Sequence, residues 1–377
     1  MHVTAVVTAA EVAEGVARAL AIVAGAVIVG ATGLAALRTV VVPRAEPVWL
    51  SSMVFVNLRR VFDALAHERR SYEDRDRIMS RYAPIALICL PITWSILVVA
   101  GFTLMFWGAV AEDSWRTSFY LSGASFTTLG SFSQEDMAAE VLSFVEAGIG
   151  LGLVALLISY LPSIYGAFQR RELAVTMLET RAGNPPSAIE LLERHATLDR
   201  LDVVGDLWPQ WEEWFADVEE THTSQGALTF FRSPEPGRSW VTAAGAVLDA
   251  ASLQLAVVDG PRDPQAALCI RAGFLCLRRI ATFYGIPHPA DPAPDEPISI
   301  SRREFDLACV RLTAADVPLR EDRDQAWRDF AGWRVNYDVV LVALAGLTMA
   351  PWALWSSDRA ERYRVGVSWR GRRRSRR

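Results

Sequence analysis

The amino-acid sequence predicts an all-α membrane protein, with three transmembrane helices followed by an α-helical cytosolic domain. The 377-residue chain is 51% hydrophobic and 21% charged, and before residue 170 its apolar residues concentrate in three long uncharged runs. Arginines flank these runs unevenly, and the second half has the composition of an ordinary globular protein. These observations exclude both a wholly soluble enzyme and a wholly embedded transporter.

The first apolar run lies between Arg18 and Arg38, and its 19 residues carry no charge. A helix needs about 20 residues to cross a bilayer. A cleavable signal peptide is the competing interpretation, but the run is longer than a signal h-region and lies well inside the chain. We therefore expect a transmembrane helix within an N-terminal segment, 1–42.

The second and third runs are also long enough to span a bilayer. Residues 82–111 contain no charge, although Pro84 and Pro91 interrupt them, and residues 147–168 continue a run that begins near Ala138. Both leave room for tilt. The polar stretch between them, 112–140, is too short for a domain.

Arginine placement predicts the orientation of these helices. The segment 43–81 is rich in arginine, and Arg170 and Arg171 directly follow the third run. In contrast, the segment 112–140 has a single arginine, Arg116. Positively charged loops stay in the cytoplasm. We expect 43–81 to be a cytosolic loop, everything after 169 to be cytoplasmic, and the N-terminus and 112–140 to be outside a multi-pass plasma (cell) membrane protein.

A fourth apolar run, 339–355, has two interpretations. As a span it would export a tail with six arginines, against the orientation rule. We expect a buried cytosolic helix that ends before Pro351; a fourth span is the alternative.

A motif lies between the second and third runs. Residues 114–125 predict a short amphipathic helix, which leads into Phe-Thr-Thr-Leu-Gly-Ser-Phe at 126–132. Over roughly residues 82–172 the chain here resembles the pore-loop potassium channel family, whose pore helix runs into a Thr-Thr-Val-Gly-Tyr-Gly-Asp filter. The first four filter positions are matched by Thr127, Thr128, Leu129 and Gly130.

The resemblance implies a channel-like pore domain, 82–172, with a re-entrant pore loop and a homotetramer around the ion. In such filters, rings of backbone carbonyls replace the hydration shell of the cation. The resemblance also implies a permeant monovalent cation, with K⁺ as the candidate, and no cofactor. Ser131 and Phe132 replace the family's Tyr and second Gly, a position where other residues reach the required backbone angle at about 1–2 kcal/mol. We therefore expect atypical or relaxed selectivity.

Four further positions on the third run belong to this candidate site. Glu146 is a carboxylate in a membrane helix. Direct ion contact is one role, and pore support through a hydrogen bond to Ser125 or Thr127 is the favoured one. Three glycines beyond it permit either gating bends or close packing. They are Gly148, Gly150 and Gly152.

The cytosolic domain, 173–360, is predicted to be helical throughout. Helices are expected at 188–195, 200–220, 239–258, 263–284, 301–314 and 320–350. Trp208, Trp211 and Trp214 predict a buried helix face, with an aromatic ligand box as the alternative. Nucleotide-binding loops, zinc motifs and catalytic sets are missing from the sequence, so we do not expect an enzyme.

The basic tail, 361–377, carries nearly unopposed positive charge, which favours anionic lipids over nucleic acid. Its arginines are Arg370, Arg372, Arg373, Arg374, Arg376 and Arg377. The sequence thus predicts a potassium-channel-like cation pore regulated by its cytosolic domain. The alternative is a non-conducting membrane-anchored sensor or scaffold whose helical domain binds a partner.

Overall fold

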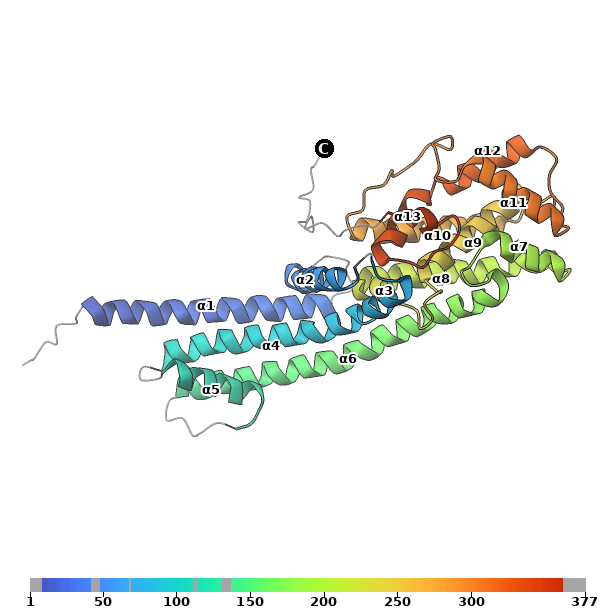
Figure 1. Ribbon diagram of the computed structural model, residues 1–377. Coiled ribbons are helices and arrows are strands. Elements are labelled where there is room, and N and C mark those ends of the chain that lie inside the picture. Colours follow the sequence, from blue (N-terminus) through green and yellow to red (C-terminus); the bar gives the residue numbers. More distant parts are fainter. Residues whose placement is uncertain (1–8, 42–47, 68, 111–113, 131–136, 362–377) are drawn as a thin grey trace, which may run out of the picture. The chain divides into compact units, whose positions relative to one another are not determined.

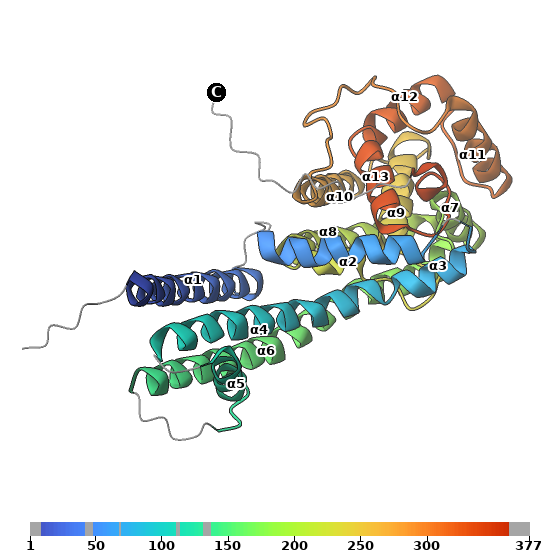
Figure 2. The ribbon, with the colours of Figure 1, turned by 60° about the vertical axis from the view of Figure 1, so that its left-hand side comes forward.

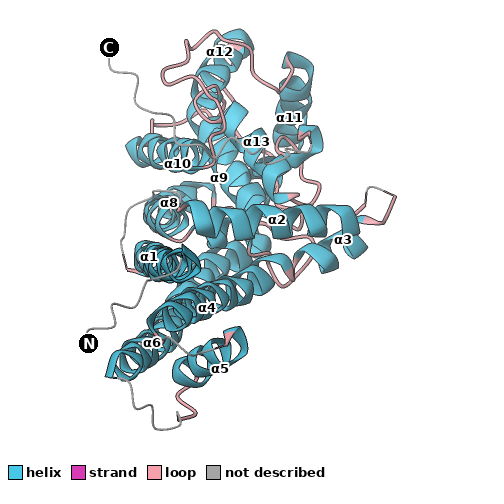
Figure 3. Ribbon diagram, turned by 90° about the vertical axis from the view of Figure 1, so that its left-hand side faces the viewer, coloured by secondary structure: helices cyan, strands magenta, loops and turns pink. Residues whose placement is uncertain are grey.

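The computed structural model describes residues 9–41, 48–67, 69–110, 114–130 and 137–361 (Figure 1). Throughout these residues the regular structure is helical and no strand occurs (Figure 3). Three helical stretches are long and apolar enough to cross a membrane: Ala10–Val40, Tyr72–Ala109 and Met137–Ala182. The all-helical class and the three span-length helices predicted from the sequence are confirmed.

The described residues up to 182 form six α-helices. They are α1 (Ala9–Val40), α2 (Trp49–Leu65), α3 (Tyr72–Met79), α4 (Tyr82–Ala109), α5 (Trp115–Phe126) and α6 (Met137–Ala182). The second part adds seven α-helices and three short 3₁₀ helices. They are α7 (Ala188–Thr197), η1 (Leu201–Asp206), α8 (Leu207–Ser224), η2 (Gly226–Phe230), α9 (Trp240–Ala256), α10 (Pro264–Phe283), α11 (Arg302–Ala314), α12 (Arg323–Arg334), α13 (Asp338–Thr348) and η3 (Ser357–Arg359).

The described residues form two compact units. Unit 1 comprises residues 9–41, 48–57, 85–110, 114–130 and 137–163, and unit 2 comprises 58–67, 69–84 and 164–361. The segment 43–81, expected only as a loop, contains α2 and α3. Ser71 caps α3 by accepting the Asp74 N–H.

Unit 1 is built around α4, which lies beside α1 and the first half of α6 (Figures 1 and 2). A stripe at four-residue spacing, Trp94, Val98, Phe102 and Phe106, faces its core. Gly25 of α1 lies so close to α4 that an added Cβ would be 2.3 Å from the Gly101 carbonyl oxygen. Small residues therefore set this helix contact, as expected between membrane helices.

Within unit 1, Arg18 caps the C-terminal end of α4. Its guanidinium donates to the carbonyls of Trp107 (3.2 Å) and Val110 (2.7 Å) and lies over the Trp107 ring. Carbonyls at a helix C-terminus have no partner within the helix, so a cation there satisfies them.

Unit 2 is a helical domain centred on α9, which is buried along nearly its whole length. Helices α7, α10, α12 and α13 contact α9, and α8 packs along α10. Trp208, Trp211 and Trp214 lie in this core. Their prediction as a buried face is confirmed.

The fourth apolar run forms α13, which ends at Thr348, before Pro351. Val340, Leu341 and Leu344 are buried in the core of unit 2. Together with α12, from which it is bent by 55°, α13 also passes the length and composition test for a span. Arg334 lies at this bend with no exposed surface.

Arg334 belongs to a buried ion-pair cluster with Asp249 and Asp338. Tyr337 donates to the Asp249 carboxylate (2.8 Å). Burial raises the pKa of Asp249, and the Arg334 charge opposes that shift. Each charge in the cluster is thus paired, as buried charges require.

A short segment around η2 is held by side chains that come from other helices of unit 2. Arg171 of α6 is almost fully buried and donates to the carbonyls of Leu228 and Phe231, both at 2.8 Å. Trp240 donates to Thr229 (3.3 Å), and the Tyr284 hydroxyl donates to Gly226 (2.6 Å).

Candidate functional site

The candidate site is built on α5, the short helix between α4 and α6. Ser114 caps its N-terminus by accepting the Thr117 N–H (3.2 Å), and the helix ends at Phe126 with Thr127 as its C-cap. The sequence predicted this helix at 114–125, so its bounds agree within one residue.

Helix α5 runs back along α4 in the opposite direction. Near its start, the Trp115 ring stacks on Trp107 with ring centroids 4.8 Å apart. Further along, the Ser122 hydroxyl oxygen lies 3.0 Å from the Val99 carbonyl oxygen. Val99 lies ten residues before the end of α4, about 15 Å along its axis.

The C-terminal end of α5 meets α6 at Gly150. A Cβ added there would be 2.4 Å from the Phe126 carbonyl oxygen, whereas Gly148 and Gly152 face open space. The sequence left two roles for these glycines, gating bends or close packing. Close packing is observed at Gly150 and not at Gly148 or Gly152. Gly150 lies thirteen residues into α6, about 20 Å from its start.

The backbone after α5 leaves the helical conformation at once. Thr128 and Gly130 adopt left-handed angles, with φ of 55° and 91°. The Leu129 N–H donates back to the Ala124 carbonyl (3.0 Å), and 81% of the Leu129 side chain is exposed. The Thr127 hydroxyl donates to the Gly123 carbonyl (2.7 Å).

Two of the predicted filter residues, Ser131 and Phe132, lie outside the described residues, as does the arginine-rich tail. The structure describes the other four predicted filter residues, which directly follow the C-terminal end of α5. They are Thr127, Thr128, Leu129 and Gly130.

Glu146 is fully buried against α5. The Ser122 hydroxyl donates to its Oε1 at 2.6 Å. The sequence pointed to Ser125 or Thr127 as its partner, and the contact instead falls one turn earlier. The signal for it was present, because Ser118, Ser122 and Ser125 recur at helical spacing and all three are buried.

Several polar atoms in this interface have no hydrogen-bond partner among the described residues. They are Glu146 Oε2 and the hydroxyls of Ser118, Ser125 and Ser143. Buried polar atoms of this kind can be satisfied by ordered water molecules. No group of three His, Cys, Asp or Glu side chains is placed to hold a metal ion in the described part of the chain.

The arrangement is suited to cations. A helix C-terminus carries a partial negative charge, and the four residues that follow α5 are exposed. Comparisons with protein-family models, curated proteins and solved structures found no match to this chain.

Proposed function

We propose that the protein is an integral membrane protein whose chains assemble, as a homotetramer, around a potassium-channel-like cation pore with relaxed selectivity. The pore is formed by the exposed backbone of Thr127 to Gly130, with α5 as its re-entrant pore helix. The helical domain of unit 2 regulates it from the cytoplasm.

One observation carries this proposal: non-helical backbone lies deep within the length of two span-length helices. Contacts to Val99 and Gly150 put the C-terminal end of α5 about 15–20 Å inside α4 and α6, and the hydrocarbon core of a bilayer is about 30 Å thick. Irregular backbone at that depth is tolerated only if protein buries it or water fills the space before it. A ring of neighbouring copies around a water-filled axis would meet this requirement for the exposed residues 127–130.

Two further features support cation rather than anion passage. The C-terminal end of α5 directs its partial negative charge toward residues 127–130. Glu146, bonded to Ser122, supports the same end from behind, so we assign it a supporting role.

The test is ion flux through the purified full chain in liposomes, first under a potassium gradient and then under a sodium gradient. We expect flux in both, because Ser131 and Phe132 replace the residues that complete a selective filter. Matched liposomes without protein set the background. Particles in detergent should be four-fold; monomers or dimers would exclude the pore.

A double variant separates conduction from the alternative. Ser131→Tyr with Phe132→Gly restores the family pattern, and we expect it to raise the ratio of potassium to sodium flux. If this variant is silent even after deletion of 184–377, conduction is wrong. The protein would then be a membrane-anchored scaffold acting through unit 2.

A further inference from the structure

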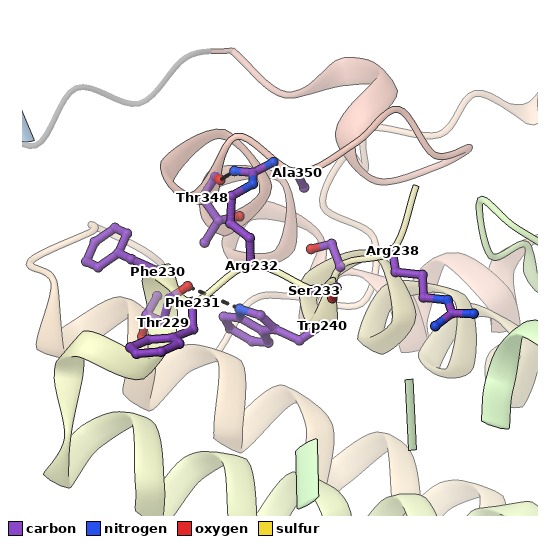
Figure 4. A pocket seen from close by; sticks show the side chains of 10 residues that line it. Thr229, Phe230, Phe231, Arg232, Ser233, Arg238, Trp240, Thr348 and Ala350 are labelled. Carbon is purple, nitrogen blue, oxygen red and sulfur yellow. Dashed lines mark hydrogen bonds between the residues drawn. The ribbon is translucent and has the colours of Figure 1, made fainter. Parts of the chain in front are cut away.

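We propose that a small pocket in unit 2 binds a halide-sized inorganic anion, with chloride as the cellular ligand. The pocket lies where the loop 229–233 meets the first turn of α9 and the end of α13 (Figure 4). It is separate from the pore segment, so this proposal stands whether or not the protein conducts.

The charged side chains of the lining do not oppose an anion. Arg232 and Arg238 line the pocket, and its described lining includes no Asp or Glu. Arg232 is held in place by the carbonyls of Thr348 (2.7 Å) and Met349 (2.8 Å). The acids that pair with the two arginines, Asp76 and Glu179, are not lining residues.

The donors that an anion needs come from two independent features. Ser233 is only 7% exposed, and its buried hydroxyl has no hydrogen-bond partner among the described residues. A buried hydroxyl without a partner costs free energy, so a ligand that accepts from it gains that amount. Ser233 is one of the lining residues drawn in Figure 4.

The second feature is the N-terminus of α9, a helix of 17 residues. Its cap, Ser239, accepts the Val241 N–H (3.3 Å). The N–H groups of a first turn have no partners within the helix, and the helix dipole is positive there. Ser239 and Trp240 both line the pocket.

The size of the pocket selects the ligand. Its volume is about 20 Å³, a little more than one water molecule requires. A nucleotide, a lipid headgroup or a free phosphate is too large to be enclosed there, and the positive end of the α9 dipole disfavours a cation. A single monatomic anion fits both the space and the charge.

The first experiment measures the ³⁵Cl NMR line width of chloride with the full chain in detergent. We expect the protein to broaden the line and bromide to reverse the broadening by competition. Ser233→Ala should weaken chloride affinity about tenfold, because it removes one hydrogen bond to a charged acceptor. Ser301→Ala is the matched control, because it removes a cap hydroxyl from α11 and should leave the broadening unchanged.

The second experiment replaces the ligand with a tethered carboxylate. Wild-type protein should unfold at a higher temperature in chloride than in gluconate at equal ionic strength. Ser233→Asp should be as stable in gluconate as wild type is in chloride, and should lose the chloride dependence.

Three results would overturn the proposal. They are no competable broadening by the wild type, equal broadening by Ser233→Ala, or a Ser233→Asp protein that unfolds at lower temperature than wild type in both salts. The last result would identify a neutral pocket that holds only water. The bromide competition uses wild-type protein, so it decides the question even if a variant fails to fold.

Discussion

Glu146 shows how much one buried carboxylate holds in place. Because it accepts from Ser122 at 2.6 Å with no exposed surface, Glu146→Ala should lower the free energy of unfolding by about 1–3 kcal/mol, measured by SDS titration in mixed micelles. Glu146→Gln keeps an acceptor oxygen and should lose less. Glu140→Ala, at an exposed position on the same helix, is the control; an equal loss there would remove the special role of Glu146.

His222 makes the stability of unit 2 depend on pH. Its Nε2 lies 3.0 Å from the Arg171 guanidinium, which can only donate, so the ring accepts and is neutral. Burial, and then the Arg171 charge, lower the pKa of His222 well below 6.5. The unfolded chain therefore binds a proton that the folded chain does not.

It follows that this contribution is fully present above pH 6.5 and is lost as the pH falls below it, by up to about 1.4 kcal/mol per pH unit. Chemical unfolding between pH 5 and 8 should show this slope, and His222→Gln should flatten it. An unchanged slope in the variant would mean that other groups cause the acid sensitivity.

At the scale of elements, the packing of α5 on α6 depends on one missing side chain. Gly150→Ala would place a methyl group 2.4 Å from the Phe126 carbonyl oxygen and should destabilise unit 1 by about 1–3 kcal/mol. It should also change flux, because the end of α5 must move.

Gly148→Ala and Gly152→Ala are matched controls on the same helix. Their added methyl groups meet open space, so each should change the unfolding free energy by no more than about 1 kcal/mol, in the stabilising direction. Equal effects at all three positions in thermal unfolding and flux would contradict the assigned contact.

The helices themselves were largely predictable, because apolar periodicity, caps and prolines are local signals. Helix α5 and the end of α13 before Pro351 follow from them. The break that divides 320–350 into α12 and α13 was not foreseen, since Arg334 and Asp338 read as ordinary surface charges until Asp249 joins them from α9. The Ser122–Glu146 contact was missed for a similar reason: the rotation of α5 against α6 is set by Gly150, not by either helix alone.

For the whole molecule, charge at the C-terminal end should decide how strongly the protein binds an anionic membrane surface. Deleting 370–377 removes six arginines, and each contributes about 1 kcal/mol near an anionic surface. We expect the deletion to weaken binding of the protein in detergent to anionic vesicles, measured by co-sedimentation, with neutral vesicles as the control. Equal binding by both proteins would contradict the assigned role of the tail.

The segment around η2 has a consequence for hydrogen exchange. Its carbonyls accept from the side chains of Arg171, Trp240 and Tyr284 in addition to the backbone hydrogen bonds of its own 3₁₀ helix. Its amides at Leu228 and Phe231 donate within the segment, and opening them requires those three side chains to withdraw. This loop should therefore exchange its amide protons as slowly as α9 and α10, so that it opens only with the cooperative unfolding of unit 2.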